Sequence, residues 1–276
     1  MGLFNRDKKN PTAEMSFLEH LEVLRWHLMR SSIVVVLLAI TFFVFNDFLF
    51  DGLIFAPKSS DFWTYRMLCK LSDKLQMGDS LCIKKFDFKL INTDISGQFT
   101  MHMWAALVAG IVTGFPYLIW ELWRFIKPAL YNKELKNTKG VVFAVSSLFM
   151  SGVLFGYYII VPLSINFLGT YQISTQVENY ITMDSFISVV TTITLATGII
   201  FQLPVLVYFL TKLGIMTPHF MRTYRRHAVV VILILSAFIT PSPDITSQLL
   251  VALPLYLLYE VSIFVSMYVT KKQEMI

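Results

Sequence analysis

The stretch FPYLIWELWRFIKPALYNKE, residues 115–134, passes from an apolar run into a polar segment and so marks one end of a membrane span. Its apolar part covers residues 115–120, and the polar part that follows carries aromatic and cationic side chains. Both kinds of residue are common where a helix leaves a bilayer. An acidic residue such as Glu134, held at a fixed distance beyond a Phe-x-x-Pro turn, is not needed for that purpose. The segment therefore also indicates a binding function.

The composition of the whole chain is that of a membrane protein. Of its 276 residues, 55% are hydrophobic and 15% are charged, and the mean hydropathy is +0.62. Soluble domains carry about 25% charged residues. The N-terminal segment is polar and charged as far as Arg30, and several apolar runs of similar length follow. We therefore expect the first span to stay in the mature chain, unlike a cleaved signal peptide.

Six apolar runs approach the roughly 20 residues that a helix needs to cross the hydrocarbon core. In chain order they cover residues 29–46, 99–120, 141–163, 186–210, 227–240 and 249–269. We predict a single all-α membrane domain, residues 1–276, with six transmembrane helices. The fifth and sixth spans are predicted to be short. The fifth falls below the thickness of the core at about 1.5 Å per residue.

Lysine and arginine fix the expected orientation, because cytoplasmic flanks keep cations near the ends of spans. The N-terminal segment and the link after span two carry five each, the link after span four carries four and the tail carries two. The links after spans three and five carry none. Both termini are therefore predicted to be cytoplasmic, with an N-terminal segment at 1–28 and a long extracytoplasmic first loop at 47–98.

Both cysteines, Cys69 and Cys82, fall in this first loop. An oxidising compartment favours a disulfide between them, but two free thiols are equally compatible with their spacing. We expect no metal site and no cofactor, and no glycine-rich loop for a nucleotide is present in the sequence. The net charge of +5 follows from the cytoplasmic flanks, so we expect no nucleic-acid partner.

The segment MSFLEHLEVLRWHLMR, residues 15–30, has the spacing of an amphipathic helix. Its apolar stripe consists of Phe17, Leu21, Leu24 and Leu28. The residues broadly opposite are Glu19, Glu22, Trp26 and Arg30. Such a helix can lie along the cytoplasmic interface as an anchor before it turns into the first span. Interfacial helices usually present Lys and Arg to anionic lipid, so the acidic face also fits a cationic ligand.

Glu134 adds a second carboxylate on the same cytoplasmic face. It could simply pair with Lys133 or Lys136 in solvent, for about 0 to 1 kcal/mol. Two carboxylate sites on one face are also what a guanidinium-bearing peptide would use, because carboxylates accept paired hydrogen bonds from arginine. Both interpretations are open on spacing alone.

Inside the membrane the sequence places Gln202 in span four and Glu260 in span six. Pro204 follows Gln202 and should kink the fourth span, because proline removes a backbone donor. An ionisable group as deep as Glu260 is a functional hypothesis by default. These residues would also suit an ion-coupled secondary transporter, although such folds often show inverted repeats and none is evident here. The sequence contains no Gly-x-Ser-x-Gly element, so we do not expect an enzyme.

Four stretches in the same order resemble the TatC family, the multispanning receptor subunit of the twin-arginine protein translocase. They are HLEVLRWHL at 20–28, FPYLIWELWRFIKPALYNKE at 115–134, FQLPVLV at 201–207 and FITPSPDITSQLLVALPLYLLYE at 238–260. The resemblance covers nearly the whole chain. It implies a six-span bacterial inner-membrane protein with both termini in the cytoplasm.

The resemblance implies a cytoplasmic site for the Arg-Arg motif of signal peptides. The residues that match the loop pattern of this site are Phe125, Pro128, Leu130, Tyr131 and Glu134. In the first motif the family reads His-Leu-x-Glu-Leu-Arg, whereas this chain has Val23 at the glutamate position, followed by Leu24 and Arg25. Glu19 lies about 40° from Val23 around a helix and Glu22 about 100°. We therefore predict that Glu19 substitutes for the missing glutamate, with Glu22 second.

The other two stretches imply further roles. Gln202 and Pro204 fall in an intramembrane groove, where some family members carry a glutamate; glutamine there cannot titrate. Thr240 and Gln248 correspond to a cluster that docks single-span partner subunits. Pro241 and Asp244 match a tight extracytoplasmic turn, and Glu260 matches an acidic position with no assigned role.

Together the resemblance implies a receptor that binds twin-arginine signal peptides and nucleates a complex for the transport of folded proteins, driven by the proton gradient. TatA-like and possibly TatB-like single-span subunits, membrane lipid and further copies of the chain are the expected partners. The competing hypotheses are the secondary transporter that uses Gln202 and Glu260, and a lipid-interacting scaffold without cargo.

Overall fold

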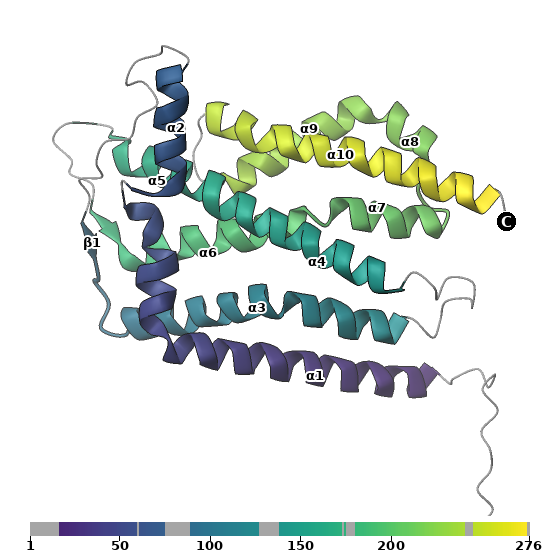
Figure 1. Cartoon of the computed structure of the whole chain (residues 1–276), viewed down its shortest axis with the longest axis horizontal. Helices are drawn as coiled ribbons and strands as arrows, with labels where there is room; N and C mark the ends of the chain where they lie inside the picture. The colour runs from purple at the N-terminus through teal and green to yellow at the C-terminus, as the bar shows by residue number, and fades with distance from the viewer. Residues whose placement is uncertain are drawn as a thin grey trace, which may run out of the picture.

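The computed structural model describes most of the chain. The described residues are 17–59, 61–74, 89–126, 138–172, 174, 180–240 and 245–274. Long helices run beside one another along the long axis, and short elements gather at one end (Figure 1). Among the described residues, five helical segments are long and apolar enough to cross a membrane. The predicted all-α membrane fold is confirmed.

The first span belongs to α1 (Phe17–Val44), which packs along α3 (Gly97–Ile126). We expected the amphipathic segment to turn before entering the span, but α1 continues through both without a break. No glycine or proline interrupts this segment, so the backbone has no reason to turn. The amphipathic segment is therefore the first part of the spanning helix.

Glycine lets α1 and α3 approach closely at their middle. A Cβ on Gly110 would lie 2.8 Å from both Ala39 N and Val35 O of α1. Gly114, one turn further along α3, faces side-chain atoms of Val35 and Leu38. Small residues at such a crossing permit backbone contact between membrane helices. Gly110 and Gly114 therefore serve the packing of α3 on α1.

The third span consists of α4 (Thr138–Phe155), the π-helical turn η6 (Gly156–Ile160) and α5 (Val161–Thr170). Pro162 occupies the first turn of α5, where the missing N–H matters least. Gly152 and Gly156 of this span face Thr197 and Phe201 across the helix contact. This second pair of glycines therefore also serves packing.

The fourth span is divided, as predicted from Pro204. It consists of α6 (Met183–Ile200) and α7 (Leu203–Lys212), which meet at Phe201 and Gln202. Pro204 lies in the first turn of α7 and cannot donate a backbone hydrogen bond. α5, α6 and α10 contribute fully buried residues to one hydrophobic core. Val161 of α5, Ile187 of α6 and Leu255 of α10 belong to this core.

The last two spans differ from each other in length. The short α8 (Pro218–Thr223) leads into α9 (Arg225–Ile239), whose 15 residues reach about 22 Å, so the fifth span is short as predicted. The sixth span, predicted at 249–269, lies at residues 251–271 and is shorter than the first four spans, although the helix that contains it, α10 (Ile245–Glu274), has 30 residues. Apolar positions end before the helix does, because the polar residues after Val269 still favour helix.

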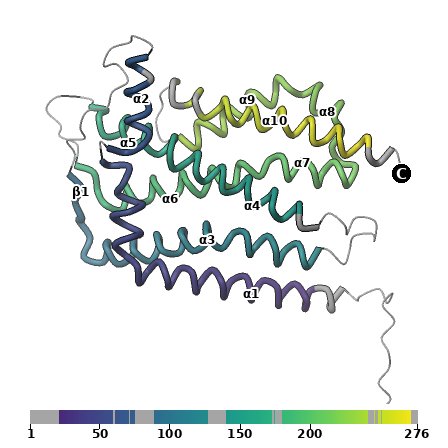
Figure 2. The backbone as a smooth tube through the Cα atoms, viewed as in Figure 1, coloured from purple at the N-terminus to yellow at the C-terminus, as the bar shows by residue number. Residues whose placement is uncertain are grey.

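The first loop folds against the ends of the spans. It contains η1 (Phe48–Ile54), η2 (Ala56–Lys58), α2 (Trp63–Lys74) and the strand β1 (Leu90–Ile91). β1 pairs in parallel with β2 (Ile181–Thr182), with Leu90 opposite Ile181. The backbone trace in Figure 2 shows β1 and α2 at the same end of the molecule. Cys69 of α2 is not a free thiol, but Cys82 lies outside the described residues, so the disulfide stays a prediction.

Tyr65 links α2 to the third span through a hydrogen bond. Its side chain is buried, and its hydroxyl lies 2.9 Å from Pro57 O and 3.2 Å from Pro162 O. Burial raises the pKa of Tyr65 above its ordinary value of 10.0. The folded state therefore favours the neutral phenol, and the phenol's contribution to stability is present below pH 10 and is lost as the pH rises above it.

We expect Tyr65→Phe to lower the free energy of unfolding by about 1 kcal/mol at pH 7, because buried carbonyl groups lose their donor. The difference in the free energy of unfolding between wild type and variant should become smaller above pH 10. Thermal unfolding in detergent at pH 7 and pH 11 measures both, with Tyr268→Phe on the exposed side of α10 as the control. A difference that did not change between pH 7 and pH 11 would contradict the conclusion that the folded state favours the neutral Tyr65 phenol.

The two ends of the molecule differ in charge. The beginnings of α1 and α4 lie at one end with the ends of α3, α7 and α10 (Figure 1). The cation-rich segments of the sequence adjoin these helix ends. The short elements of the first loop lie at the other end. This arrangement agrees with the predicted orientation, which itself stays a prediction.

Candidate functional site

The loop motif begins at the end of α3. Phe125 is half-buried one residue before the helix ends. The other four residues of the predicted motif, Pro128, Leu130, Tyr131 and Glu134, lie outside the described residues. Pro241 and Asp244 of the predicted extracytoplasmic turn lie outside them too. The structure does describe the two helix ends that flank the motif, at Ile126 and Thr138.

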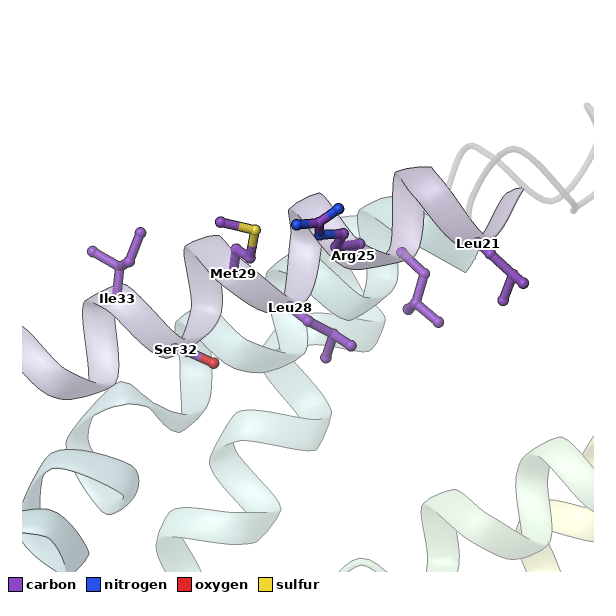
Figure 3. A pocket seen from close by; sticks show the side chains of 7 residues that line it. Leu21, Arg25, Leu28, Met29, Ser32 and Ile33 are labelled. Atoms are coloured by element: carbon purple, nitrogen blue, oxygen red, sulfur yellow. The ribbon is translucent and has the colours of Figure 1, made fainter. Parts of the chain in front are cut away.

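The N-terminal motif lies on α1 at the same end of the molecule. Glu22 and Arg25 are exposed, and Glu19 lies on the helix with its side chain outside the described residues. Figure 3 shows Arg25 among apolar side chains that line a shallow pocket of about 490 Å³ along α1. The labelled residues around it are Leu21, Leu28, Met29, Ser32 and Ile33. A cation here has apolar surface beneath its stem and solvent at its head.

Between these two motifs lies a buried carboxylate, Glu121 of α3, which is 1% exposed. Oε2 lies 2.5 Å from Nδ1 of His27 on α1. Oε1 accepts a hydrogen bond from the Tyr117 hydroxyl at 3.0 Å and lies 3.5 Å from Nη1 of Arg124. Donors thus surround both oxygens, as a buried charge requires.

Two aromatic contacts extend this cluster. The His27 ring meets the Phe125 ring edge-on, with centroids 6.1 Å apart. The Arg124 guanidinium lies 4.8 Å from the centre of a Trp120 ring, within cation–π range. His27 therefore contacts both the buried carboxylate and the first aromatic residue of the loop motif.

Sequence reasoning did not single out Glu121 or His27. Glu121 stands in the quoted stretch with Tyr117 four residues before it and Arg124 three residues after it, which is helical pair spacing. That signal was available, together with the rule that ionisable residues near membrane depth need partners. The third partner could not be found in this way, because His27 is 94 residues away in the chain.

An apolar groove of about 1590 Å³ lies between the third, fourth and sixth spans and the end of α3. Among the residues that line it are Trp120, Trp123, Ser146, Pro204, Tyr208 and Val261. Trp123 Nε1 and Ser146 Oγ are buried there and have no hydrogen-bond partner among the described residues. The groove is thus apolar with a few unpaired polar atoms in its wall.

Gln202 lies behind this groove at the break between α6 and α7. Its Nε2 donates to Val145 O at 3.3 Å, which ties the break to α4. Its Oε1 is buried and has no partner among the residues that the structure describes. Pro204 is itself buried and lines the groove, so of the two predicted groove residues the structure places Pro204 in the wall and Gln202 next to it.

Thr240 and Gln248, predicted to dock partner subunits, are both engaged within the chain. Thr240 is 4% exposed and its hydroxyl donates to Ser236 O at 2.8 Å. Gln248 of α10 donates through Nε2 to Leu233 O of α9 at 3.0 Å. Thr240 therefore caps the end of α9, and Gln248 links α10 to α9.

Glu260, left without a role by the sequence, joins α9 to α10 near the opposite end of α9. Its Oε2 lies 2.7 Å from Nη2 of Arg225, and its Oε1 accepts from the Tyr256 hydroxyl at 3.0 Å. The carboxylate is thus an internal ion-pair partner. Among the described residues, no three histidine, cysteine or acidic side chains group as metal ligands would.

The long apolar helices and the polar cluster at one end define a multi-pass membrane protein. A family model for the Sec-independent protein translocase protein (TatC) matches residues 19–254. The TatC of Blattabacterium sp. subsp. Periplaneta americana is 38% identical over 266 residues, which cover 96% of this chain and 100% of the relative. TatCy of Bacillus subtilis is 31% identical over 253 residues, 92% of this chain and 89% of the relative.

Two crystal structures of the twin-arginine translocase receptor TatC are also similar. One has a TM-score of 0.63 and 29% identity, covering 91% of this chain and 99% of that chain. The other, in DDM, has a TM-score of 0.66 and 30% identity, covering 89% and 98%. The chain belongs to the TatC family. It is a bacterial inner-membrane subunit of the Tat translocase, a family that is in general not enzymatic.

Proposed function

We propose that this chain is the signal-peptide receptor of its translocase, and that it binds the Arg-Arg motif where α1 and the end of α3 converge. The observation that carries the proposal is the contact between His27 of α1 and Phe125 of α3, whose ring centroids are 6.1 Å apart. It brings together the two sequence motifs that are separated by about 100 residues.

The arginines of the peptide need carboxylates that are not already engaged. Glu121 is buried with both oxygens occupied, so it is unsuited to bind a ligand from solvent. Glu22 is exposed, and Glu134 and Glu19 complete the proposed set. Arginine can bind a carboxylate through two parallel hydrogen bonds, which lysine cannot do. This difference gives the site its preference for Arg-Arg over Lys-Lys.

The apolar part of the signal peptide would then enter the groove in front of Gln202. Trp120 and Arg124 near the end of α3 line the groove, so the groove begins close to the proposed arginine site. The mostly apolar lining of the groove suits the apolar part of a signal peptide. Gln202 cannot carry a proton, so coupling to the proton gradient has to use groups other than this one.

Single-span TatA-like and TatB-like subunits would gather at α9 and α10. Thr240 would act by capping the end of α9 and Gln248 by linking α10 to α9, since their own hydrogen bonds lie within the chain. The outward sides of α9 and α10 are apolar and exposed, including Val230, Phe238 and Leu253. A single-span helix could pack on such a surface through van der Waals contact.

Export of a folded reporter tests the proposal. Cells that lack the gene should fail to export the reporter when it carries an Arg-Arg signal, and the chain supplied in trans should restore export. A Lys-Lys signal should not be exported in either case. If export were unaffected by the deletion and uptake of a small solute failed instead, the secondary-transporter hypothesis would replace the receptor.

A further inference from the structure

We propose that Glu121 and His27 form a clamp that positions the two halves of the twin-arginine site relative to each other. This inference rests on the proposed receptor function. Glu121 is a positioning residue in it, because the buried carboxylate has no access to a peptide. The clamp is defined as the His27 Nδ1 to Glu121 Oε2 contact of 2.5 Å, with the Tyr117 hydroxyl on the other carboxylate oxygen.

The clamp holds a part of the helix pair that the glycine contact does not reach. The backbone contact of Gly110 with Val35 and Ala39 lies at the middle of α1 and α3. Glu121 is eleven residues further along α3, about 16 Å at 1.5 Å per residue. A small change in crossing angle at the glycine would separate the two helix ends by a larger distance. The clamp opposes this motion close to where the peptide is expected to bind.

His27 links the clamp to both halves of the site. Its ring contacts Glu121 through Nδ1 and meets Phe125 edge-on at 6.1 Å. On its own helix it lies two residues after Arg25 and five after Glu22, both exposed toward solvent. Phe125 in turn begins the loop motif that leads to Glu134. The side chain of His27 therefore sets the position of Phe125 against the acidic face of α1.

Stability alone does not account for a buried charge at this place. Apolar side chains of similar volume usually hold two helices together at least as well as a buried ion pair does. A fully hydrogen-bonded polar network fixes one arrangement of its helices, because alternatives leave its members unpaired. In this chain the fixed arrangement is the one that joins α1 to the start of the loop motif.

The test uses a variant that should fold well but lack the clamp, His27→Leu with Glu121→Leu. Purified wild type and variant are titrated with a fluorescent twin-arginine signal peptide, and their thermal unfolding is followed. Nitroxide labels on non-canonical residues at the exposed positions Val23 and Leu122 report the distance between α1 and α3. The swapped variant, His27→Glu with Glu121→His, tests rescue. Glu260→Gln breaks the Arg225 ion pair between α9 and α10 and serves as the control.

The proposal expects the double-leucine variant to unfold at or above the temperature of wild type, yet to bind the peptide about tenfold more weakly with a broadened distance distribution. The swap should recover most of the affinity, and Glu260→Gln should leave it unchanged. A double-leucine variant that bound as tightly as wild type would overturn the clamp. Wild type that bound Arg-Arg and Lys-Lys peptides equally would instead overturn the receptor function on which the clamp rests.

Discussion

Replacement of Glu134 by glutamine should weaken binding of a twin-arginine peptide by about tenfold to a hundredfold. A hydrogen bond to a charged group contributes about 1.5–3 kcal/mol, and 1.4 kcal/mol corresponds to a factor of ten in affinity. Glutamine keeps the size of the side chain and one acceptor oxygen but removes the charge. Titration with a fluorescent peptide in detergent measures the change.

The matched control for Glu134→Gln is Glu274→Gln, the last residue of α10. It removes the same charge at a position outside both sequence motifs, so any general electrostatic attraction of the peptide is subtracted. Glu19→Gln and Glu22→Gln, measured in the same series, decide which carboxylate replaces the one missing at Val23. Equal binding by Glu134→Gln and wild type would contradict the assigned role of Glu134.

The second large effect is expected on stability, at the crossing of α1 and α3. Gly110→Ala should lower the free energy of unfolding by about 2 kcal/mol, because overpacking of a tight contact typically costs about 1–3 kcal/mol. The added Cβ would lie 2.8 Å from two backbone atoms of α1, so the helix itself has to move. Thermal unfolding in detergent and the amount of protein in the membrane report the loss.

Alanine variants of two other glycines, which have looser surroundings, should lose less stability than Gly110→Ala. Gly114→Ala should cost less, since its nearest neighbours are side-chain atoms at 3.2 and 3.3 Å, which can shift. Gly140→Ala, with nothing within 4 Å, should be neutral or stabilising by up to about 1 kcal/mol through helix propensity. If all three variants unfolded alike, close backbone contact at Gly110 would not be what holds α1 to α3.

Local patterns in the sequence were sufficient for most of the fold. Apolar runs predicted the spanning helices, and Pro204 predicted the break between α6 and α7, because both signals are contained in a few consecutive residues. The continuous α1 was not predicted, since amphipathic spacing does not tell whether a helix turns where its composition changes. The sixth span was placed within two residues, but the extension of α10 beyond it was not predicted, because hydropathy marks the end of the apolar run and not the end of the helix.

The candidate site was predicted less completely. Glu22 and Arg25 come from a motif near the beginning of α1 and Phe125 from a motif at the end of α3, and these two helix ends lie at the same end of the molecule (Figure 1). The clamp could not be predicted in full, because which α1 residue faces Glu121 depends on the register of two helices that are distant in the sequence. The ion pair between Glu260 and Arg225 could not be predicted for the same reason, because it forms only when α9 and α10 pack together.

The most direct test of the receptor function is site-specific crosslinking of a signal peptide to the membrane-embedded wild-type protein. A photoreactive residue placed at Val23 on α1, and a second at Leu122 on α3, would each be exposed to peptides that differ only in Arg-Arg or Lys-Lys. The receptor function predicts strong crosslinks with Arg-Arg from both positions and weak crosslinks with Lys-Lys. Equal crosslinking by the two peptides would contradict it.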